Sequence, residues 1–239
     1  MGCWWVVFGG GTHARMVAND AGAQGTVRGG WEIVFMGFGG WGDAAFEVLV
    51  GLEGEPGPDR LEAQRESLER HVRGPLQDLC DELNEMDEFG TFWLSGLSGH
   101  PAAWQRQSAS WWIARRIRIS FTFGLDGLVL GGGSASPAGD QVRLFREMVD
   151  AEVSGHELAA VIERLLKVGY ELIGSPLLRV PREYSPDHPR ADLLKRRFVY
   201  AEKPIDTDDV DEIADALRPL VELTTWYTDY VATTGWDKP

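Results

Sequence analysis

The chain lacks the residue patterns by which several classes of protein are recognised. Its 239 residues include only two cysteines, Cys3 and Cys80, which are too few for a disulfide scaffold. Neither cysteine has a partner at metal-ligand spacing, and the five histidines show no paired spacing that suits zinc. We therefore expect no metal site, and a reducing compartment is consistent with this cysteine usage.

Long apolar runs are also absent. No stretch approaches the roughly 20 apolar residues that a membrane-spanning helix needs. Residues 1–8 lack the basic residues that begin a secretory signal, and their apolar run ends at Gly9-Gly10-Gly11. These observations predict a cytoplasmic protein that does not act at a membrane.

Positive charge is scarce. The chain has 23 Lys and Arg against 37 Asp and Glu, a formal net charge of −14. Binding to nucleic acid needs clustered basic residues that neutralise phosphates, so a nucleic-acid partner is not expected. The acids concentrate in residues 206–215, which we interpret as the start of an acidic helix, favourable with the helix dipole.

The motifs of nucleotide binding and nucleophilic catalysis are missing as well. Neither Gly9-Gly10-Gly11 nor Gly131-Gly132-Gly133 is followed by the Lys-Ser/Thr pair of a phosphate-binding loop, and both are interpreted as turns. There is no serine nucleophile elbow and no convincing Cys-His pair. No cofactor is predicted, and the sequence leaves open whether the protein is an enzyme.

The residues that are present predict one α+β domain, with an antiparallel or mixed sheet covered by helices. In residues 1–34 the apolar residues follow neither a helical nor an alternating period over a full element. We therefore expect these residues to form a loosely organised N-terminal extension, followed by the domain at 35–239. Helices and hairpin strands then mix without regular βαβ alternation. The expected helices begin at Asp43, cover 61–83 with a kink at Gly74-Pro75, and follow at 140–149, 154–169 and 207–230 with a bend at Pro219. The expected strands are 117–123, 128–130, 170–180 and 197–201, with a loop at 131–139.

Three blocks of sequence carry a family resemblance. They are 38–76, ending in Arg-Gly-Pro-Leu; 126–133 with the following Asp140-Gln141; and 181–194, which contains Asp187-His188-Pro189-Arg190. In this order the chain resembles the uncharacterised family catalogued as domain of unknown function 2461. The resemblance implies no established activity.

The chain departs from that family at its most polar positions. The resemblance implies an Asn-rich turn followed by Trp, His and Tyr along the first long helix, where this chain has Pro56, Leu61, Gln64 and Leu68 and keeps only Arg65. It also implies an Arg- and Lys-rich motif before the hairpin, which residues 91–107 do not match. Either this region has diverged, or 1–34 and 91–116 include stretches translated in the wrong frame.

The segment 181–194 holds the best candidate site. An imidazole at His188 beside Asp187 could be held in one tautomer, and Arg182 and Arg190 lie close in sequence to a helix start that could bind an anion. The structural alternative is that Ser185 or Asp187 caps this helix. A phosphate- or carboxylate-bearing ligand is the resulting hypothesis.

Other arginines have simpler explanations. Arg65 and Arg73 share a helix face, and the family resemblance adds Arg65 to the candidate site. Arg116 and Arg118 fall on the polar face of the 117–123 strand, where solvent exposure is expected.

Two classes of function follow. The protein is either a binder or enzyme for a small anionic molecule, with a pocket between the sheet and the 181–194 loop, or a non-catalytic interaction or assembly protein. Its oligomeric state and any reaction are not indicated by the sequence.

Overall fold

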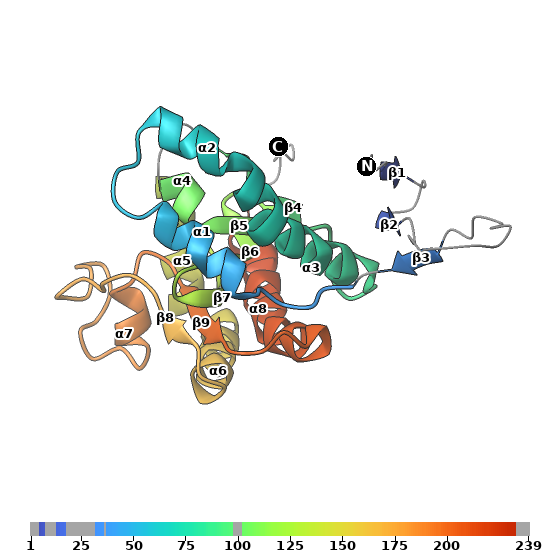
Figure 1. Ribbon diagram of the computed structural model, residues 1–239. Helices are drawn as coiled ribbons and strands as arrows, with labels where there is room; N and C mark the ends of the chain where they lie inside the picture. The colour runs from blue at the N-terminus through green and yellow to red at the C-terminus, as the bar shows by residue number, and fades with distance from the viewer. Residues whose placement is uncertain (1–4, 8–12, 18–31, 36, 98–101, 233–239) are drawn as a thin grey trace, which may run out of the picture.

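The computed structural model describes residues 5–7, 13–17, 32–35, 37–97 and 102–232. It confirms the predicted α+β class. A six-stranded sheet, antiparallel throughout, packs against helices in a single domain (Figure 1). The strand order β4-β5-β6-β7-β9-β8 places the predicted hairpin at the centre. These strands are β4 (Trp93–Leu94), β5 (Gln107–Ala114), β6 (Ile117–Gly124), β7 (Gly127–Gly133), β8 (Glu171–Leu172) and β9 (Tyr200–Ile205).

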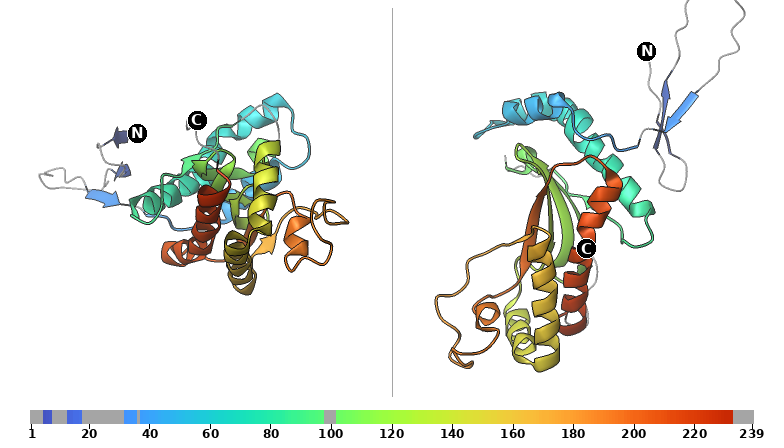
Figure 2. Two further views of the ribbon diagram at one scale, coloured as in Figure 1. Left: turned by 180° about the vertical axis from the view of Figure 1, so that it is seen from behind. Right: turned by 90° about the horizontal axis from the view of Figure 1, so that it is seen from below.

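The described part of the chain also contains eight α-helices and one π-helical turn. They are α1 (Asp43–Gly51), α2 (Pro58–Leu68), the π-helical turn η1 (Glu69–Arg73), α3 (Gly74–Glu85), α4 (Ala102–Gln105), α5 (Gly139–Asp150), α6 (Glu152–Lys167), α7 (Ala191–Leu194) and α8 (Val210–Tyr230). The right-hand view of Figure 2 shows α8 and α3 on the same side of the curved sheet. Helix α6 packs against α8.

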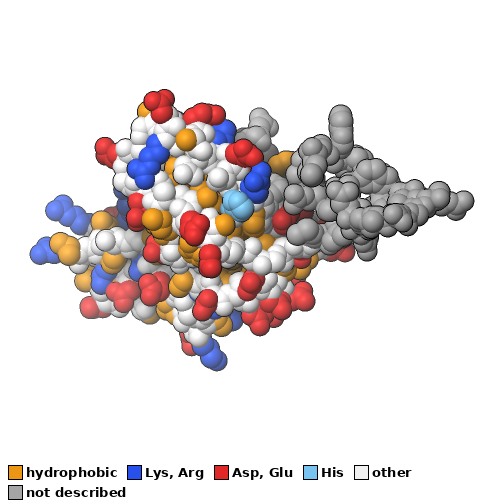
Figure 3. All heavy atoms as spheres, viewed as in Figure 1, with side chains coloured by type: hydrophobic (Ala, Val, Ile, Leu, Met, Phe, Trp, Pro, Cys, Tyr) orange, Lys and Arg blue, Asp and Glu red, His pale blue; other side chains and the backbone are white. Residues whose placement is uncertain are grey.

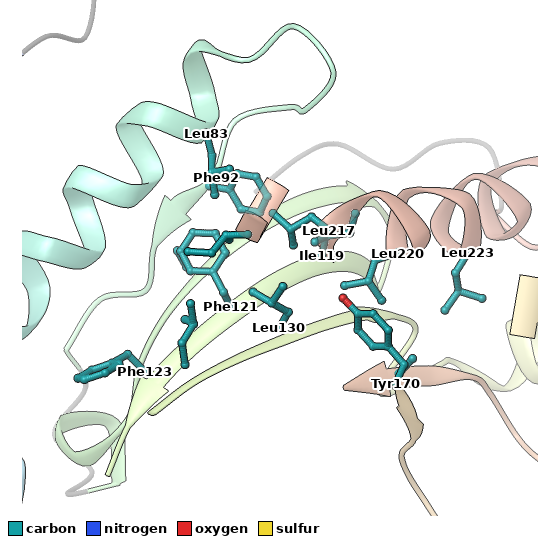
Figure 4. Close-up of a cluster of buried hydrophobic side chains, with 14 of the residues drawn as sticks. Leu83, Phe92, Ile119, Phe121, Phe123, Leu130, Tyr170, Leu217, Leu220 and Leu223 are labelled. Atoms are coloured by element: carbon teal, nitrogen blue, oxygen red, sulfur yellow. The ribbon is translucent and has the colours of Figure 1, made fainter. Parts of the chain in front are cut away.

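The core lies between α8 and the alternating apolar side chains of the central strands. Ile117, Ile119, Phe121 and Phe123 are all buried, as the period-two pattern predicts. Figure 4 shows Leu217 and Leu220 of α8 beside Ile119 and Leu130 of the sheet. Burial of these side chains supplies the main driving force for packing α8 onto the sheet.

The interpretation of Gly131-Gly132-Gly133 as a loop is wrong, because all three glycines belong to β7. A Cβ at Gly132 would lie 3.0 Å from Leu220 Cβ, so the missing side chain lets α8 approach the sheet closely. Glycine in a strand interior marks such close approaches.

The long helix predicted at 61–83 changes its geometry just before Gly74-Pro75, where a kink or break was predicted. α2 changes into η1, and α3 begins at Gly74 with Pro75 in its first turn. Proline has no N–H to donate to the preceding turn, which explains the break. Trp41 Nε1 donates to the Val72 carbonyl at 3.0 Å, fixing the chain before α1 against this irregular turn.

Several boundaries differ from the prediction. The strand predicted at 170–180 is only β8, and the strand predicted at 197–201 is β9, which begins at Tyr200 and continues to Ile205. Gly42, not Asp43, occupies the N-cap of α1. Helix α8 is confirmed with Pro219 inside it, and its N-cap is Asp209.

Strand β5 was not predicted. It lies within 91–116, for which a wrong reading frame was considered, yet it pairs with β6 from Gln107↔Phe123 to Ala114↔Ile117. This integration into the sheet favours divergence over a wrong reading frame for 107–114. Residues 115–116 form the turn into β6, so Arg116, with φ 63°, lies in the turn and not on a strand face.

Residues 1–34, predicted as an extension, contain β1 (Trp5–Val7), β2 (His13–Val17) and most of β3 (Glu32–Phe35), which form an antiparallel sheet in the order β1-β2-β3.

None of the helices in the described part of the chain combines the length and hydropathy of a bilayer crossing. On the face seen in Figure 3, acidic side chains are spread among the Lys and Arg residues.

Candidate functional site

The face of the central sheet opposite α8 carries mainly polar and glycine residues. We call it the polar face. Along β6 it presents Arg118, Ser120 and Thr122, which alternate with the buried apolar residues. The strand register sets Arg118 in one row with Gly133 and Tyr200, and Ser120 in the next row with Gly131 and Glu202. These rows bring together side chains more than 80 residues apart in sequence.

Tyr200 reaches across β7 to Ser120. Its hydroxyl lies 2.8 Å from Ser120 Oγ in a buried hydrogen bond in which either group can donate. The ring passes over Gly131, where an added Cβ would lie 2.7 Å from the Tyr200 hydroxyl. The absence of a side chain at Gly131 therefore makes this contact between β9 and β6 possible.

Arg118 lies beside this hydroxyl pair. Its guanidinium carbon is 5.1 Å from the centroid of the Trp112 ring, a cation–π contact across the β5–β6 pair. Its Nε is buried and has no hydrogen-bond partner, and no carboxylate of the described residues forms an ion pair with it. The expectation that Arg118 is simply solvent-exposed is therefore wrong: the side chain is partly buried.

A cavity of about 180 Å3 opens on the polar face. Its volume is that of about six water molecules in the liquid. Ile173 and Phe198 border it, and these residues flank the segment that contains 181–194. The other lining residues are Arg106, Arg118, Ser120, Thr122, Val129, Gly131, Ala135, Tyr200 and Glu202.

The predicted site at 181–194 is built differently from expectation. Arg190 donates from Nε to Val149 O at 2.7 Å and from Nη2 to Asp150 O and Ala151 O, so its guanidinium satisfies carbonyls at the end of α5. His188 Nδ1 accepts from the Arg190 backbone N–H at 3.0 Å. These contacts anchor the loop to α5.

Of the other predicted residues, Arg182, Asp187 and Arg65 make no hydrogen bond with Arg190 or His188 through their side chains. His188 Nε2 lies 3.4 Å from Asp150 Oδ1, whereas Arg182 and Asp187 are exposed. Arg65 is on α2, far from α7 in both Figure 1 and Figure 2, where it bonds Glu62 at 2.9 Å and lies over Trp104.

The structural alternative for this segment also needs correction. The N-cap of α7 is Arg190, not Ser185 or Asp187, and no side chain caps it. Ser185 Oγ instead accepts from the Asp187 backbone N–H at 3.2 Å. This is a local turn contact.

The model of the family described as conserved hypothetical protein (DUF2461) matches residues 104–227, just over half of the chain. The chain belongs to the DUF2461 family. The match includes the second and third blocks of the predicted resemblance, whereas the first block, 38–76, lies outside it. No curated protein and no solved structure matches the chain.

All the residues that line the cavity fall inside the DUF2461 match, whereas Arg65 falls outside it. The cavity was not predicted, because Arg118 was interpreted as an exposed strand residue and Gly131 as part of a loop. The sequence did contain a signal for it. A strand with a polar face is followed by a run of three glycines, and glycine in a strand marks a place where another group approaches the backbone closely.

The arrangement offers cationic, hydroxyl and carboxylate groups in a small space. Arg118 can donate to a carboxylate or phosphate, and Ser120, Thr122 and Tyr200 can donate or accept. Within 37–97 and 102–232, no three His, Cys, Asp or Glu side chains gather closely enough to hold a metal ion.

Proposed function

We propose that this DUF2461 protein binds a small molecule with a carboxylate or phosphate group in the polar-face cavity. The observation that supports this most strongly is Arg118, whose buried Nε has no partner although the chain carries 14 more acids than bases. An unsatisfied buried donor costs about 1–3 kcal/mol, and more when it is charged. A bound anion would remove that cost.

Binding of anionic probes tests the proposal. Inorganic phosphate, succinate and propionate are titrated into the protein while the melting temperature and the heat of binding are followed. Arg118→Gln should weaken binding about 10- to 100-fold, because a charge-assisted hydrogen bond contributes about 1.5–3 kcal/mol. Arg143→Gln is the matched control, since Arg143 is exposed and forms an ion pair with Glu147 on its own helix. Equal binding by wild type and the Arg118 variant would contradict the proposal.

The location predicted from the sequence, with His188, Arg182, Arg190, Asp187 and Arg65, is tested by the same titrations. Arg182→Ala and His188→Ala change the loop site and leave in place Arg190, whose guanidinium anchors the loop to α5. Loss of binding in these variants, with Arg118→Gln unaffected, would place the anion at the loop and not on the polar face.

A non-catalytic interaction or assembly role is the second candidate. It is favoured by the loop after β8, where Leu178 is fully exposed and Leu177 is 43% exposed. Contiguous exposed apolar surface is what marks contact sites on proteins. A monomer by analytical ultracentrifugation, unchanged by Leu177→Asp and Leu178→Asp, would count against self-assembly through this loop.

A further inference from the structure

Glu202 faces the same cavity as Arg118. It is partly buried and lines the cavity, and its carboxylate forms no hydrogen bond or ion pair with a side chain of the described residues. The next residue along the strand, Lys203, points to the other side and lies over the Tyr170 ring at 5.9 Å. The cavity lining thus includes the Glu202 carboxylate and the guanidiniums of Arg106 and Arg118, and among the described residues Glu202 forms an ion pair with neither arginine.

The strand register explains why these two charges stay apart. Arg118 on β6 and Glu202 on β9 are separated by β7 and by one row of the polar face. With strands about 4.8 Å apart and about 6.7 Å between alternate residues, their Cα atoms are about 12 Å apart. Gly131 and the Ser120–Tyr200 hydroxyl pair lie between them.

A second glutamate, exposed and outside the cavity lining, lies next to Glu202 on the neighbouring strand. Glu171 on β8 is the direct register partner of Glu202. Like charges directly opposite each other on neighbouring strands are destabilising. A cationic group near these two carboxylates would relieve this repulsion, just as an anion would satisfy Arg118.

We propose that the ligand of this cavity is zwitterionic, with its anionic group at Arg118 and an ammonium group at Glu202. This inference rests on the proposed function and narrows its ligand class to small amino acids and aminoalkyl phosphates. Ser120 and Tyr200 lie between the two ends and hydrogen-bond the polar atoms there. The cavity of about 180 Å3 limits the part of the ligand that lies inside it.

The test uses matched probes on the full-length protein. Glycine, β-alanine, 4-aminobutyrate and 2-aminoethyl phosphate carry both charges. Acetate, propionate, butyrate and ethyl phosphate carry only the anion, and the corresponding alkylamines carry only the cation. For at least one pair, the zwitterion should bind roughly tenfold more tightly than the anion, the contribution of one partly desolvated ion pair. Because this comparison uses the wild-type protein, its result does not depend on whether a variant folds.

Variants then assign the charges. Glu202→Gln should abolish the preference for the zwitterion and leave the affinity for the matched anion unchanged or higher. Arg118→Gln should weaken binding of both. Glu163→Gln is the control, since Glu163 is an exposed glutamate on α6 outside the cavity lining. Circular dichroism melting confirms that each variant folds.

The outcomes separate the two proposals. If anions bind through Arg118 but the ammonium group adds no affinity in any pair, the zwitterion inference is wrong and the proposed function stands. If Glu202→Gln leaves a zwitterion preference intact, the inference is also wrong. If none of the anionic probes binds, both proposals fail.

Discussion

The Tyr200 hydroxyl on β9 lies 2.8 Å from Ser120 Oγ on β6, across the intervening strand β7. The two residues are 80 positions apart in sequence and meet only because Gly131, between them, has no side chain. Both residues line the polar-face cavity. The contact is buried, so it contributes to the fold as well as to the proposed site.

Gly131→Ala should destabilise the protein by about 1–3 kcal/mol, the usual cost of inserting a methyl group into a packed site. The new Cβ would lie 2.7 Å from the Tyr200 hydroxyl, so the ring has to move. Urea denaturation measures the change. Gly139→Ala is the control, since a Cβ there meets nothing within 4 Å. Equal stability of the two variants would mean that Tyr200 does not need the space over Gly131.

Arg190→Ala should destabilise the protein by about 1–3 kcal/mol, because it removes the guanidinium that donates to the Val149, Asp150 and Ala151 carbonyls, of which Ala151 keeps the Gly155 N–H as a donor. The exposed Arg182 provides the comparison, and Arg182→Ala should change stability by less than about 0.5 kcal/mol. Thermal unfolding of both variants checks this. Similar losses in the two would contradict a structural role specific to Arg190.

Asp209→Ala should cost about 0.5–2 kcal/mol through loss of the N-cap of α8. Asp209 Oδ1 accepts from the backbone N–H groups of Asp211 and Glu212 at 2.9 and 3.2 Å. The exposed Asp206 lies just before this cap, so Asp206→Ala is a matched control of equal charge change. Chemical denaturation should show a loss for Asp209→Ala alone.

Stability should fall as the pH rises above about 10. Burial raises the pKa of Tyr170 above its ordinary value of 10.0, so the folded protein holds this proton after the unfolded chain has released it. The contribution of this group to the free energy of unfolding is fully present below pH 10. Above pH 10 it declines with a slope of up to about 1.4 kcal/mol per pH unit. The decline should continue until the pH reaches the pKa in the folded state.

Tyr170→Phe should make that decline shallower. The Tyr170 hydroxyl donates to Ala216 O at 2.6 Å, so the variant should also lose about 0.5–1.5 kcal/mol at neutral pH. Urea denaturation between pH 8 and 11 measures both effects. An unchanged alkaline slope would contradict the role assigned to Tyr170.

The spacing of apolar residues and the positions of glycine and proline correctly predicted the elements that depend on local sequence. The alternation from Ile117 to Phe123 gave β6, and Gly74-Pro75 marked the interruption between α2 and α3. Local patterns failed at Gly131-Gly132-Gly133 and at β5. A glycine run is a turn signal by itself, and its place in β7 depends on Tyr200 and Leu220, which come from distant segments.

The amino-acid sequence by itself determined the α+β class, the central hairpin, the amphipathic helices and the family. Each depends on periodicity or on residues close together in the chain. Only the tertiary structure decided which polar groups meet. It directed Arg190 to the carbonyls of α5 and brought Arg118, Ser120, Tyr200 and Glu202 to one cavity. The register of β6, β7 and β9 determines this arrangement, and that register depends on pairing between strands far apart in sequence.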